Sequence, residues 1–162
     1  MQVSFTLRPF KSTDLDQVMN INRRSLPENY STYFFMDLHE RFPETFIVAE
    51  DKGVIVGYIM CRIETGAPDF GLLGFTKKGH VISIAVLPEY RRQGIAYALM
   101  KEAMGAMLRL KSKECFLEVR VSNTPAVKLY QKMGFKVTHT IEGYYANGEA
   151  AYKMSRKLPF EG

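Results

Sequence analysis

The N-terminal third of the chain shows two kinds of hydrophobic periodicity. Apolar and polar residues alternate over 3–10, as in a β-strand. Apolar residues then recur at helical spacing over 12–24, after a Ser-Thr-Asp start, and a second helix is predicted over 31–42. Two apolar runs on either side of the turn 51–53 predict a β-hairpin.

The middle of the chain is expected to alternate strands and helices. Residues 65–79, rich in Gly, Pro, Lys and Asp, form the longest predicted loop, and such a loop in a compact domain is either mobile or functional. The pattern predicts a strand over 80–87, a helix over 92–109 and a strand over 115–121. Because a helix joins these strands, we expect parallel neighbours with a right-handed crossover.

The C-terminal part predicts one more helix and a final hairpin. Thr124 is the expected N-cap, Pro125 the first helical residue and Gly134 the C-cap. The last two strands are expected to pair around Asn147-Gly148, the strongest short turn signal in the chain. The predicted order is β-α-α-β-β-β-α-β-α-β-β, an α/β (α+β) chain.

The composition fits one packed domain over 1–162, with 46% hydrophobic and 24% charged residues. The N-terminus does not resemble a signal peptide, and the chain contains no apolar run long enough for a membrane span. Cys61 and Cys115 lie far apart and lack metal-ligand spacing. We therefore expect a cytoplasmic protein with two buried free thiols.

The net charge of +5 leaves the partner open. It suits nucleic acid, the ribosome surface or a phosphorylated cofactor, and equally a mildly basic soluble protein. The basic residues are scattered and no RNA-binding motif with stacking aromatics is present, and no DNA partner is expected. A basic module that binds ribosomal RNA stays open as a non-enzymatic alternative.

The stretch VISIAVLPEYRRQGIAYALMKEAM, residues 81–104, leads from an apolar strand into a helix. A helix start presents unpaired N–H groups and a partial positive charge, which suit a phosphate. Gly94 allows close backbone approach, and Arg91 and Arg92 add charge at the same point. The motif is a candidate pyrophosphate site, but it is neither a P-loop nor a G-x-G-x-x-G fingerprint. Taken alone, the motif is explained somewhat better by a helix start with solvated arginines.

A second cluster, SNTPAVKLYQKMGF, follows the next strand. It places Asn123 at the strand end and Tyr130 about two helical turns further on. Tyr130 shares a helix face with Ala126 and Met133, so it is a candidate functional phenol or an ordinary core aromatic.

Together, Arg-x-x-Gly-x-Ala after V-L-P-E-Y and the motif N-T-P-A-V-K-L-Y-Q-K-M-G-F resemble the GCN5-related N-acetyltransferase (GNAT) superfamily over essentially the whole chain. The resemblance implies acetyl-CoA as co-substrate. It also implies a mixed, mostly antiparallel sheet of about seven strands, with a parallel central pair and about four flanking helices.

Four further stretches resemble the NatA-type catalytic subunits, especially their archaeal, stand-alone form: LPENY (26–30), the strand that begins at His80, LEVRVSN with Glu118, and EGYYANGEAAY (142–152). This resemblance implies acetylation of protein α-amino groups. An α-amine has a pKa near 8, so about a tenth is neutral at pH 7 and modest base help through water suffices.

The expected catalytic residues are His80, Glu118 and Tyr130. If their strands are neighbours, His80 and Glu118 face one cleft, and the resemblance implies that they share the general-base role through water. Alone, each also fits a structural role. Carried over from the family, Tyr130 protonates or hydrogen-bonds the leaving thiolate. No dedicated metal is expected, although His80 and Glu118 could bind an adventitious divalent ion.

The remaining site predictions concern the two substrates. The residues expected to bind acetyl-CoA are Ile84, Ala85, Val86, Arg91, Arg92, Gln93, Gly94, Ile95, Ala96, Tyr97, Asn123 and Tyr130. A backbone N–H near Ala85–Val86 would stabilise the oxyanion. The residues expected to bind the peptide are Leu26, Pro27, Glu28, Tyr30, Tyr144 and Tyr145, with Glu28 tuning the choice of first residue.

The expected substrates are N-termini of proteins or nascent chains that start with Ser, Ala, Thr or Met, and a weak ribosome contact is compatible with this. Eukaryotic NatA catalytic subunits carry His where Glu118 stands, and the chain ends at 162 without their acidic tail. From the missing tail we expect activity without an auxiliary subunit. No membrane partner is expected, because the chain contains no long apolar run. The alternative within the superfamily is an acetyltransferase for lysine side chains or small amines.

Overall fold

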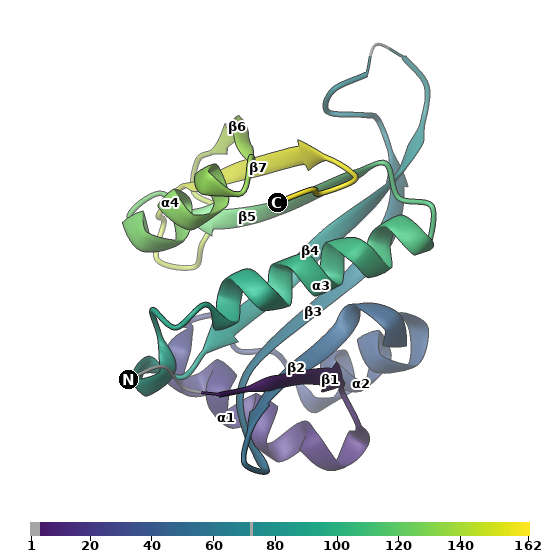
Figure 1. Ribbon diagram of the computed structural model, residues 1–162. Coiled ribbons are helices and arrows are strands. Elements are labelled where there is room, and N and C mark those ends of the chain that lie inside the picture. The colour runs from purple at the N-terminus through teal and green to yellow at the C-terminus, as the bar shows by residue number, and fades with distance from the viewer. Residues whose placement is uncertain (1–3, 72) are drawn as a thin grey trace. The chain divides into compact units, whose positions relative to one another are not determined.

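The computed structural model describes residues 4–71 and 73–162 (Figure 1). Its main elements are β1 (Thr6–Pro9), α1 (Leu15–Ser25), α2 (Thr32–Arg41), β2 (Phe46–Asp51), β3 (Val54–Gly66), β4 (Thr76–Val86), α3 (Ile95–Arg109), β5 (Glu114–Arg120), α4 (Thr124–Lys132), β6 (Lys136–Ile141) and β7 (Ala151–Lys157). Short 3-10 helices cover Ser12–Asp14, Pro43–Thr45 and Pro88–Tyr90. The order predicted from the sequence is confirmed, except that residue 3 of the first predicted strand lies outside the described residues.

The seven strands are hydrogen-bonded in the order β1-β2-β3-β4-β5-β7-β6. The β4–β5 pair is parallel, whereas β1–β2, β2–β3, β5–β7 and β6–β7 are antiparallel. The predicted mixed sheet with a parallel pair and four helices is confirmed.

The chain divides into two compact units. The first comprises Met1–Arg62 and Ile82–Ala106, and the second comprises Ile63–Val81 and Met107–Gly162. Strands β3 and β4 and helix α3 each contribute residues to both units.

The first unit has its core on β2 and β3, where residues 46–49 and 55–61 are buried. Helix α1 buries Val18, Ile21 and Asn22 along one side, as its amphipathic sequence predicts. Helix α2 starts at its N-cap Ser31, whose side chain accepts a hydrogen bond from the Phe34 N–H.

The second unit has its core on β5 and β7, which lie side by side with β6 in Figure 1. Its buried side chains include Cys115, Leu117, Met133, Phe135 and Met154. A Cβ at Gly79 of β4 would overlap the Met107 side chain, so this position of the strand accepts only glycine without rearrangement.

The predicted loop 65–79 is too long, because β3 continues to Gly66 and β4 already begins at Thr76. Lys78 made this part of the sequence look like a loop. It is in fact a buried strand residue, paired in register with Glu114, and its Nζ lies 3.1 Å from an Asp69 carboxylate oxygen. The buried ion pair of Lys78 therefore explains why the sequence pattern did not predict the first residues of this strand.

Two predicted helix boundaries are also wrong. Helix α3 begins at Ile95 instead of 92, because Arg92 (φ 62°) and Gly94 (φ 82°) are left-handed. The N-cap of α4 is Asn123 instead of Thr124, since the Asn123 side chain accepts a hydrogen bond from the Ala126 N–H (3.4 Å). The C-cap is Met133, one residue before Gly134.

The final hairpin is wider than predicted. Strand β6 ends at Ile141 and β7 begins at Ala151. Asn147-Gly148 therefore lies inside a longer connection, residues 142–150. Its turn is closed by a hydrogen bond from the Gly148 N–H to the Tyr145 carbonyl (2.8 Å).

Both cysteines, Cys61 and Cys115, are buried free thiols, as predicted. Among the described residues, no helix has the length and apolarity needed to cross a membrane.

Candidate active site

The corner between β4 and α3 is built mainly from backbone. Arg92 has a left-handed backbone (φ 62°), which is uncommon for a residue other than glycine and typical of functional turns. Gly94 is also left-handed (φ 82°), and a Cβ there would have no atom within 4 Å. Left-handed residues in a turn direct successive N–H groups to one side, which favours anions.

The start of α3 adds further donors at this corner. The Ala98 N–H donates to the Gly94 carbonyl (3.0 Å), so the N–H groups of Ile95 and Ala96 lie in the first turn, before the first N–H donor of the helical hydrogen-bond series. Arg91 Nε donates to the Val86 carbonyl (3.2 Å), which ties this side chain to the end of β4. The predicted cofactor residues 91–97 thus form one continuous turn and helix start.

The predicted peptide-binding segment 26–30 is held by Asn22, which the sequence analysis did not single out. The Asn22 side chain is 1% exposed in α1 and donates to the Glu28 carbonyl (2.9 Å). It also accepts from the Tyr30 N–H (3.4 Å) and lies 3.2 Å from the Tyr58 hydroxyl. Tyr58 in turn contacts Ser83 Oγ at 2.7 Å. The sequence feature that could have identified Asn22 is an amide side chain among the apolar positions of an amphipathic helix.

Tyr30 lies at the end of this segment. Its hydroxyl donates to the Ile82 carbonyl (3.4 Å), and its ring stacks on Phe34 with centroids 4.9 Å apart. Leu26 and Glu28 are half-buried and Pro27 is exposed. The segment therefore has a fixed backbone and partly accessible side chains.

In the second unit, the structure brings His80 and Glu118 together. His80 Nε2 lies 2.7 Å from Glu118 Oε1, and His80 is the register partner of Phe116 in the parallel β4–β5 pair. The His80 ring stacks on the Phe116 ring at 4.1 Å and 21°. The expectation that their strands are neighbours is confirmed.

The other ring nitrogen of His80 has a partner that the sequence analysis missed. His80 Nδ1 lies 2.6 Å from Glu64 Oε2, near the end of β3. The three side chains are largely covered, at 12% exposure for His80, 15% for Glu118 and 33% for Glu64. Periodicity alone could not assign Glu64, because the pairing depends on the register across a long connection.

Two lysines surround the same Phe116 ring. The Nζ atoms of Lys78 and Lys153 lie 4.8 and 4.7 Å from its centroid, and Asp69 pairs with both lysines. Burial acts to raise the pKa of Asp69, but hydrogen bonds from Lys153, Ser155 and Lys78 outweigh it and hold this pKa below its usual value.

Tyr130 is buried on α4, with its ring 6.0 Å from Phe135. Burial, with a smaller contribution from Cys115, raises the pKa of Tyr130 well above its usual value. The phenol is therefore protonated at neutral pH and can act as a hydrogen-bond donor. Among the described residues, the contacts of Tyr130 and Asn123 do not include His80 or Glu118.

Tyr144 and Tyr145 lie on the β6–β7 connection, residues 142–150, with their rings edge to face at 4.9 Å. Arg120 holds this connection, because its guanidinium lies 3.9 Å from the Tyr145 ring centroid and donates to Glu149 (2.9 Å). Hydrogen bonds from Ser122 and Arg120 hold the pKa of Glu149 below its usual value.

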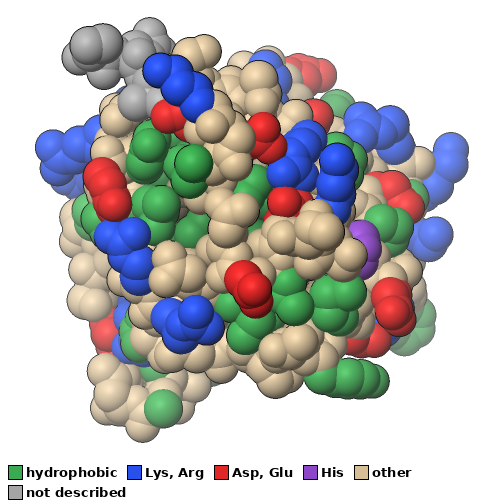
Figure 2. All heavy atoms as spheres, turned by 90° about the horizontal axis from the view of Figure 1, so that it is seen from below, with side chains coloured by type: hydrophobic (Ala, Val, Ile, Leu, Met, Phe, Trp, Pro, Cys, Tyr) green, Lys and Arg blue, Asp and Glu red, His purple; other side chains and the backbone are tan. Residues whose placement is uncertain are grey.

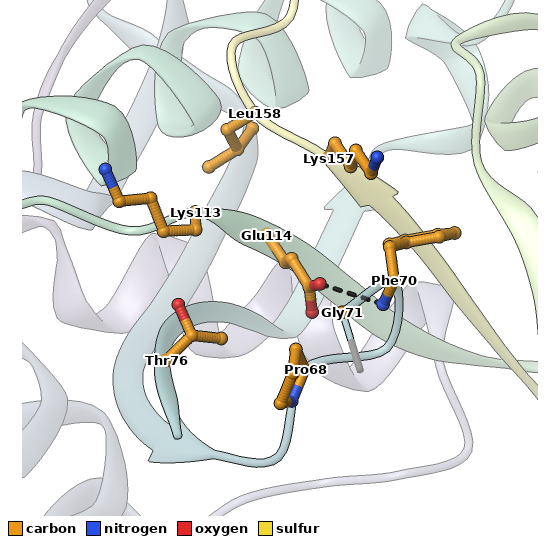
Figure 3. Close-up of a pocket in the computed structure, with 8 residues that line it drawn as sticks. All are labelled: Pro68, Phe70, Gly71, Thr76, Lys113, Glu114, Lys157 and Leu158. Carbon is orange, nitrogen blue, oxygen red and sulfur yellow. Dashed lines mark hydrogen bonds between the residues drawn. The ribbon is translucent and has the colours of Figure 1, made fainter. Parts of the chain in front are cut away.

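A cavity of about 280 Å³ also lies in the second unit (Figure 3), and the predicted site residues are not among the residues that line it. Its lining residues are Pro68, Phe70, Gly71, Thr76, Lys113, Glu114, Lys157 and Leu158. The Glu114 carboxylate accepts hydrogen bonds from the N–H groups of Asp69 (2.8 Å) and Phe70 (3.0 Å). Its direct role is to anchor the β3–β4 loop.

A mixed sheet with a parallel central pair, followed by a glycine-containing helix start, defines the N-acetyltransferase class of α/β proteins. Residues 15–135 match the Acetyltransferase (GNAT) family, and the chain belongs to this family of acetyltransferases.

The sequence is 49% identical over 156 residues to an N-alpha-acetyltransferase of Sulfurisphaera tokodaii, covering 95% of this chain and 93% of that protein. The fold matches Ard1 from Thermoplasma volcanium with a TM-score of 0.86 at 30% identity, covering 97% and 99% of the two chains. It also matches Arabidopsis thaliana Naa50 in complex with the bisubstrate analogue CoA-Ac-MVNAL, with a TM-score of 0.80 at 27% identity over 96% and 100% of the chains. The predicted family and enzyme class are confirmed.

Proposed function

We propose that residues 1–162 form one acetyltransferase domain that transfers the acetyl group of acetyl-CoA to the α-amino group of protein N-termini. The observation that carries this proposal is the partly covered His80–Glu118 pair, at 2.7 Å, in a chain whose relative is named an N-alpha-acetyltransferase. An α-amine is already partly neutral at pH 7, so a base of this kind acting through water is sufficient.

The corner between β4 and α3 would bind the pyrophosphate of acetyl-CoA. The left-handed turn at Arg92 and Gly94 and the first N–H groups of α3 supply the donors, and the two arginines supply charge. The last residues of β4, Ile84 to Val86, would contact the pantetheine arm and the oxyanion through backbone groups. Asn123 uses its Oδ1 as the helix cap, so its Nδ2 is the atom we assign to the arm.

The chemical step requires a neutral amine and a proton for the departing thiolate. His80 and Glu118 would remove the ammonium proton through water, and the amine lone pair would then attack the thioester carbonyl. Tyr130 would donate a hydrogen bond to the thiolate, since its buried phenol keeps its proton. Direct attack within a ternary complex needs no acetylated side chain.

The peptide would be recognised mainly at its first residue and its backbone. The segment 26–30, fixed by Asn22, would contact the first residue. The Glu28 carboxylate would accept a hydrogen bond from the α-amino group or from a Ser or Thr hydroxyl, so that Ser, Thr and Ala starts are accepted. Leu26 and Pro27 would accept Met. Tyr144 and Tyr145 would contact the peptide backbone without selecting a sequence. We propose that the cytoplasmic enzyme acts on nascent or finished chains without an auxiliary subunit.

The test is acetyl transfer from acetyl-CoA to short peptides that start with Ser, Ala, Met or Glu, each with a free or a blocked α-amine. We expect transfer only to free α-amines, and a loss of at least about 100-fold in the His80→Ala/Glu118→Ala variant. Transfer to blocked peptides that carry lysine would instead make the enzyme a side-chain acetyltransferase.

The ribosomal RNA-binding alternative is less well supported. On the face drawn in Figure 2, basic and acidic side chains of the described residues are interspersed and do not gather in one basic patch. A ribosome contact could accompany the enzymatic function, and sedimentation with ribosomes at increasing salt would measure it.

A further inference from the structure

Each ring nitrogen of His80 contacts a carboxylate, and this limits where the protons of the cluster can lie. A neutral imidazole has one N–H, yet both ring nitrogens lie within hydrogen-bond distance of a carboxylate oxygen, at 2.6 Å from Glu64 and 2.7 Å from Glu118. Both contacts are hydrogen bonds at the same time only if each of them holds one proton.

We propose that Glu64 is a positioning residue for this proton transfer: it holds the His80 Nδ1–H and leaves Nε2, with Glu118, as the site that receives the substrate proton. A carboxylate on Nδ1 fixes both the tautomer and the ring orientation of a catalytic histidine. The inference rests on the proposed N-terminal acetyltransferase function and adds a third residue to its base.

The proposed proton transfer uses the contact between His80 Nε2 and Glu118. The cluster first releases to solvent the proton between Nε2 and Glu118. An N–H bond of the substrate ammonium then breaks, water relays the proton into this gap, and the electron pair stays on the amine nitrogen as the nucleophile. Glu64 keeps its contact with Nδ1 through these steps, and its carboxylate offsets the positive charge that the imidazole gains.

The surroundings of His80 single out Glu64 as the unassigned contributor. Glu118 faces the ring from β5, and Phe116 covers one ring face at 4.1 Å. Lys78 of β4 and Lys153 of β7 lie near the same Phe116 ring, but both are paired with Asp69. Among these neighbours, Glu64 is the carboxylate at Nδ1.

The first test is the pH dependence of kcat for a Ser-starting peptide at saturating acetyl-CoA. Because an adjacent negative charge favours the protonated cluster, Glu64→Gln should move the midpoint of the ascending limb to lower pH by about one unit and lower the plateau about tenfold. Glu64→Asp keeps the charge and should keep the midpoint. Glu44→Gln removes an exposed charge and should match the wild type. An unmoved midpoint in Glu64→Gln, with a lower kcat at every pH, would overturn the inference.

The second test reads the tautomer without any activity. The chain has three histidines, so long-range ¹H–¹⁵N spectra of wild type and His80→Ala assign His80. Above the kinetic midpoint, we expect an Nδ1–H tautomer in the wild type and an Nε2–H tautomer in Glu64→Gln, in samples whose thermal unfolding shows a folded protein. An Nε2–H tautomer in the wild type would contradict the assignment. If no peptide is acetylated, the proposed function fails, and this spectrum alone decides the role of Glu64.

Discussion

The corner at residues 91–96 and the Glu64–His80–Glu118 cluster are built in opposite ways. The corner is one continuous stretch whose donors are backbone N–H groups, set by left-handed Arg92 and Gly94. The cluster takes one side chain from each of three strands, and its partners are 16 and 38 residues from His80 in sequence.

The comparison shows why the two sites should respond differently to substitution. A backbone site depends on conformation, so its sensitive position is the glycine, whereas single side-chain donors contribute only part of the binding. A side-chain cluster depends on each functional group, and losing one leaves its partner without a hydrogen bond. The two should separate kinetically, the first through the KM for acetyl-CoA and the second through kcat.

The largest effect should follow from Glu118→Gln. The amide has nearly the same shape but is a far weaker proton acceptor, so we expect kcat to fall about 100-fold with an unchanged KM for acetyl-CoA. Steady-state kinetics with a Ser-starting peptide measure both constants. The exposed Glu102→Gln serves as the control. A raised KM for acetyl-CoA at normal kcat would break the distinction between the two sites.

Asn22→Ala should destabilise the first unit. The substitution removes the Asn22 hydrogen bond to the Glu28 carbonyl and one of the two contacts of the buried Tyr58 hydroxyl, and we expect a loss of about 2 kcal/mol in the free energy of unfolding. The KM for the peptide should rise several-fold because segment 26–30 loses its anchor. Urea unfolding and peptide kinetics test this, with Asn29→Ala, in the same segment but exposed, for comparison. An unchanged peptide KM would separate this segment from substrate binding.

Gly94→Ala tests the backbone site directly. Alanine is strained at φ 82°, and we expect the KM for acetyl-CoA to rise about fivefold with little change in kcat. Gly53→Ala is a matched control, since Gly53 has φ 84° and equal space in the β2–β3 turn. Both variants should lose about 1 kcal/mol of stability. If both variants raised the KM for acetyl-CoA equally, backbone strain alone would explain the increase, and the corner between β4 and α3 would have no special role.

The smallest effect concerns acid stability and a purely structural ion pair. Arg8 donates two hydrogen bonds to Asp14, at 2.8 and 2.9 Å, and holds the pKa of this carboxyl below its usual value of 3.8. The pair therefore stabilises the fold above about pH 4, and this contribution is lost as the pH falls through the lowered pKa. Asp14→Asn should lose about 1 kcal/mol at pH 7 and less at pH 3.

Urea unfolding at the two pH values measures this difference. The exposed Asp16→Asn should leave both values unchanged. Because Asp14 lies outside both sites, a change in either kinetic constant in Asp14→Asn would argue that the sites are not independent of the surrounding fold.

Much of the fold could be predicted because its signals are local. Helical periodicity placed α1 and α2, and the corner between β4 and α3 is a contiguous motif whose glycine and arginines stand at fixed spacing. The errors arose where a tertiary contact overrides the local pattern. The charge of Lys78 is typical of a loop residue, but its ion pair with Asp69 and the pairing of β4 with β5 allow it to be buried in a strand.

The candidate site was predictable in proportion to its contiguity. His80 and Glu118 could be paired because the order of their strands followed from the crossover helix. Glu64 and Asn22 could not be assigned, since their partners are set by strand register and by a loop path that no short-range pattern encodes.

The Arg120–Glu149 ion pair has a consequence for how a peptide would be bound. Glu149 also accepts a hydrogen bond from the Ser122 N–H (3.0 Å). The β6–β7 connection is therefore attached to the C-terminal end of β5 without any ligand. A preorganised connection loses little conformational entropy on binding. If Tyr144 and Tyr145 contact the peptide as we propose, their rings would meet many different peptides at a similar entropic cost, and a rigid connection would then favour broad substrate tolerance.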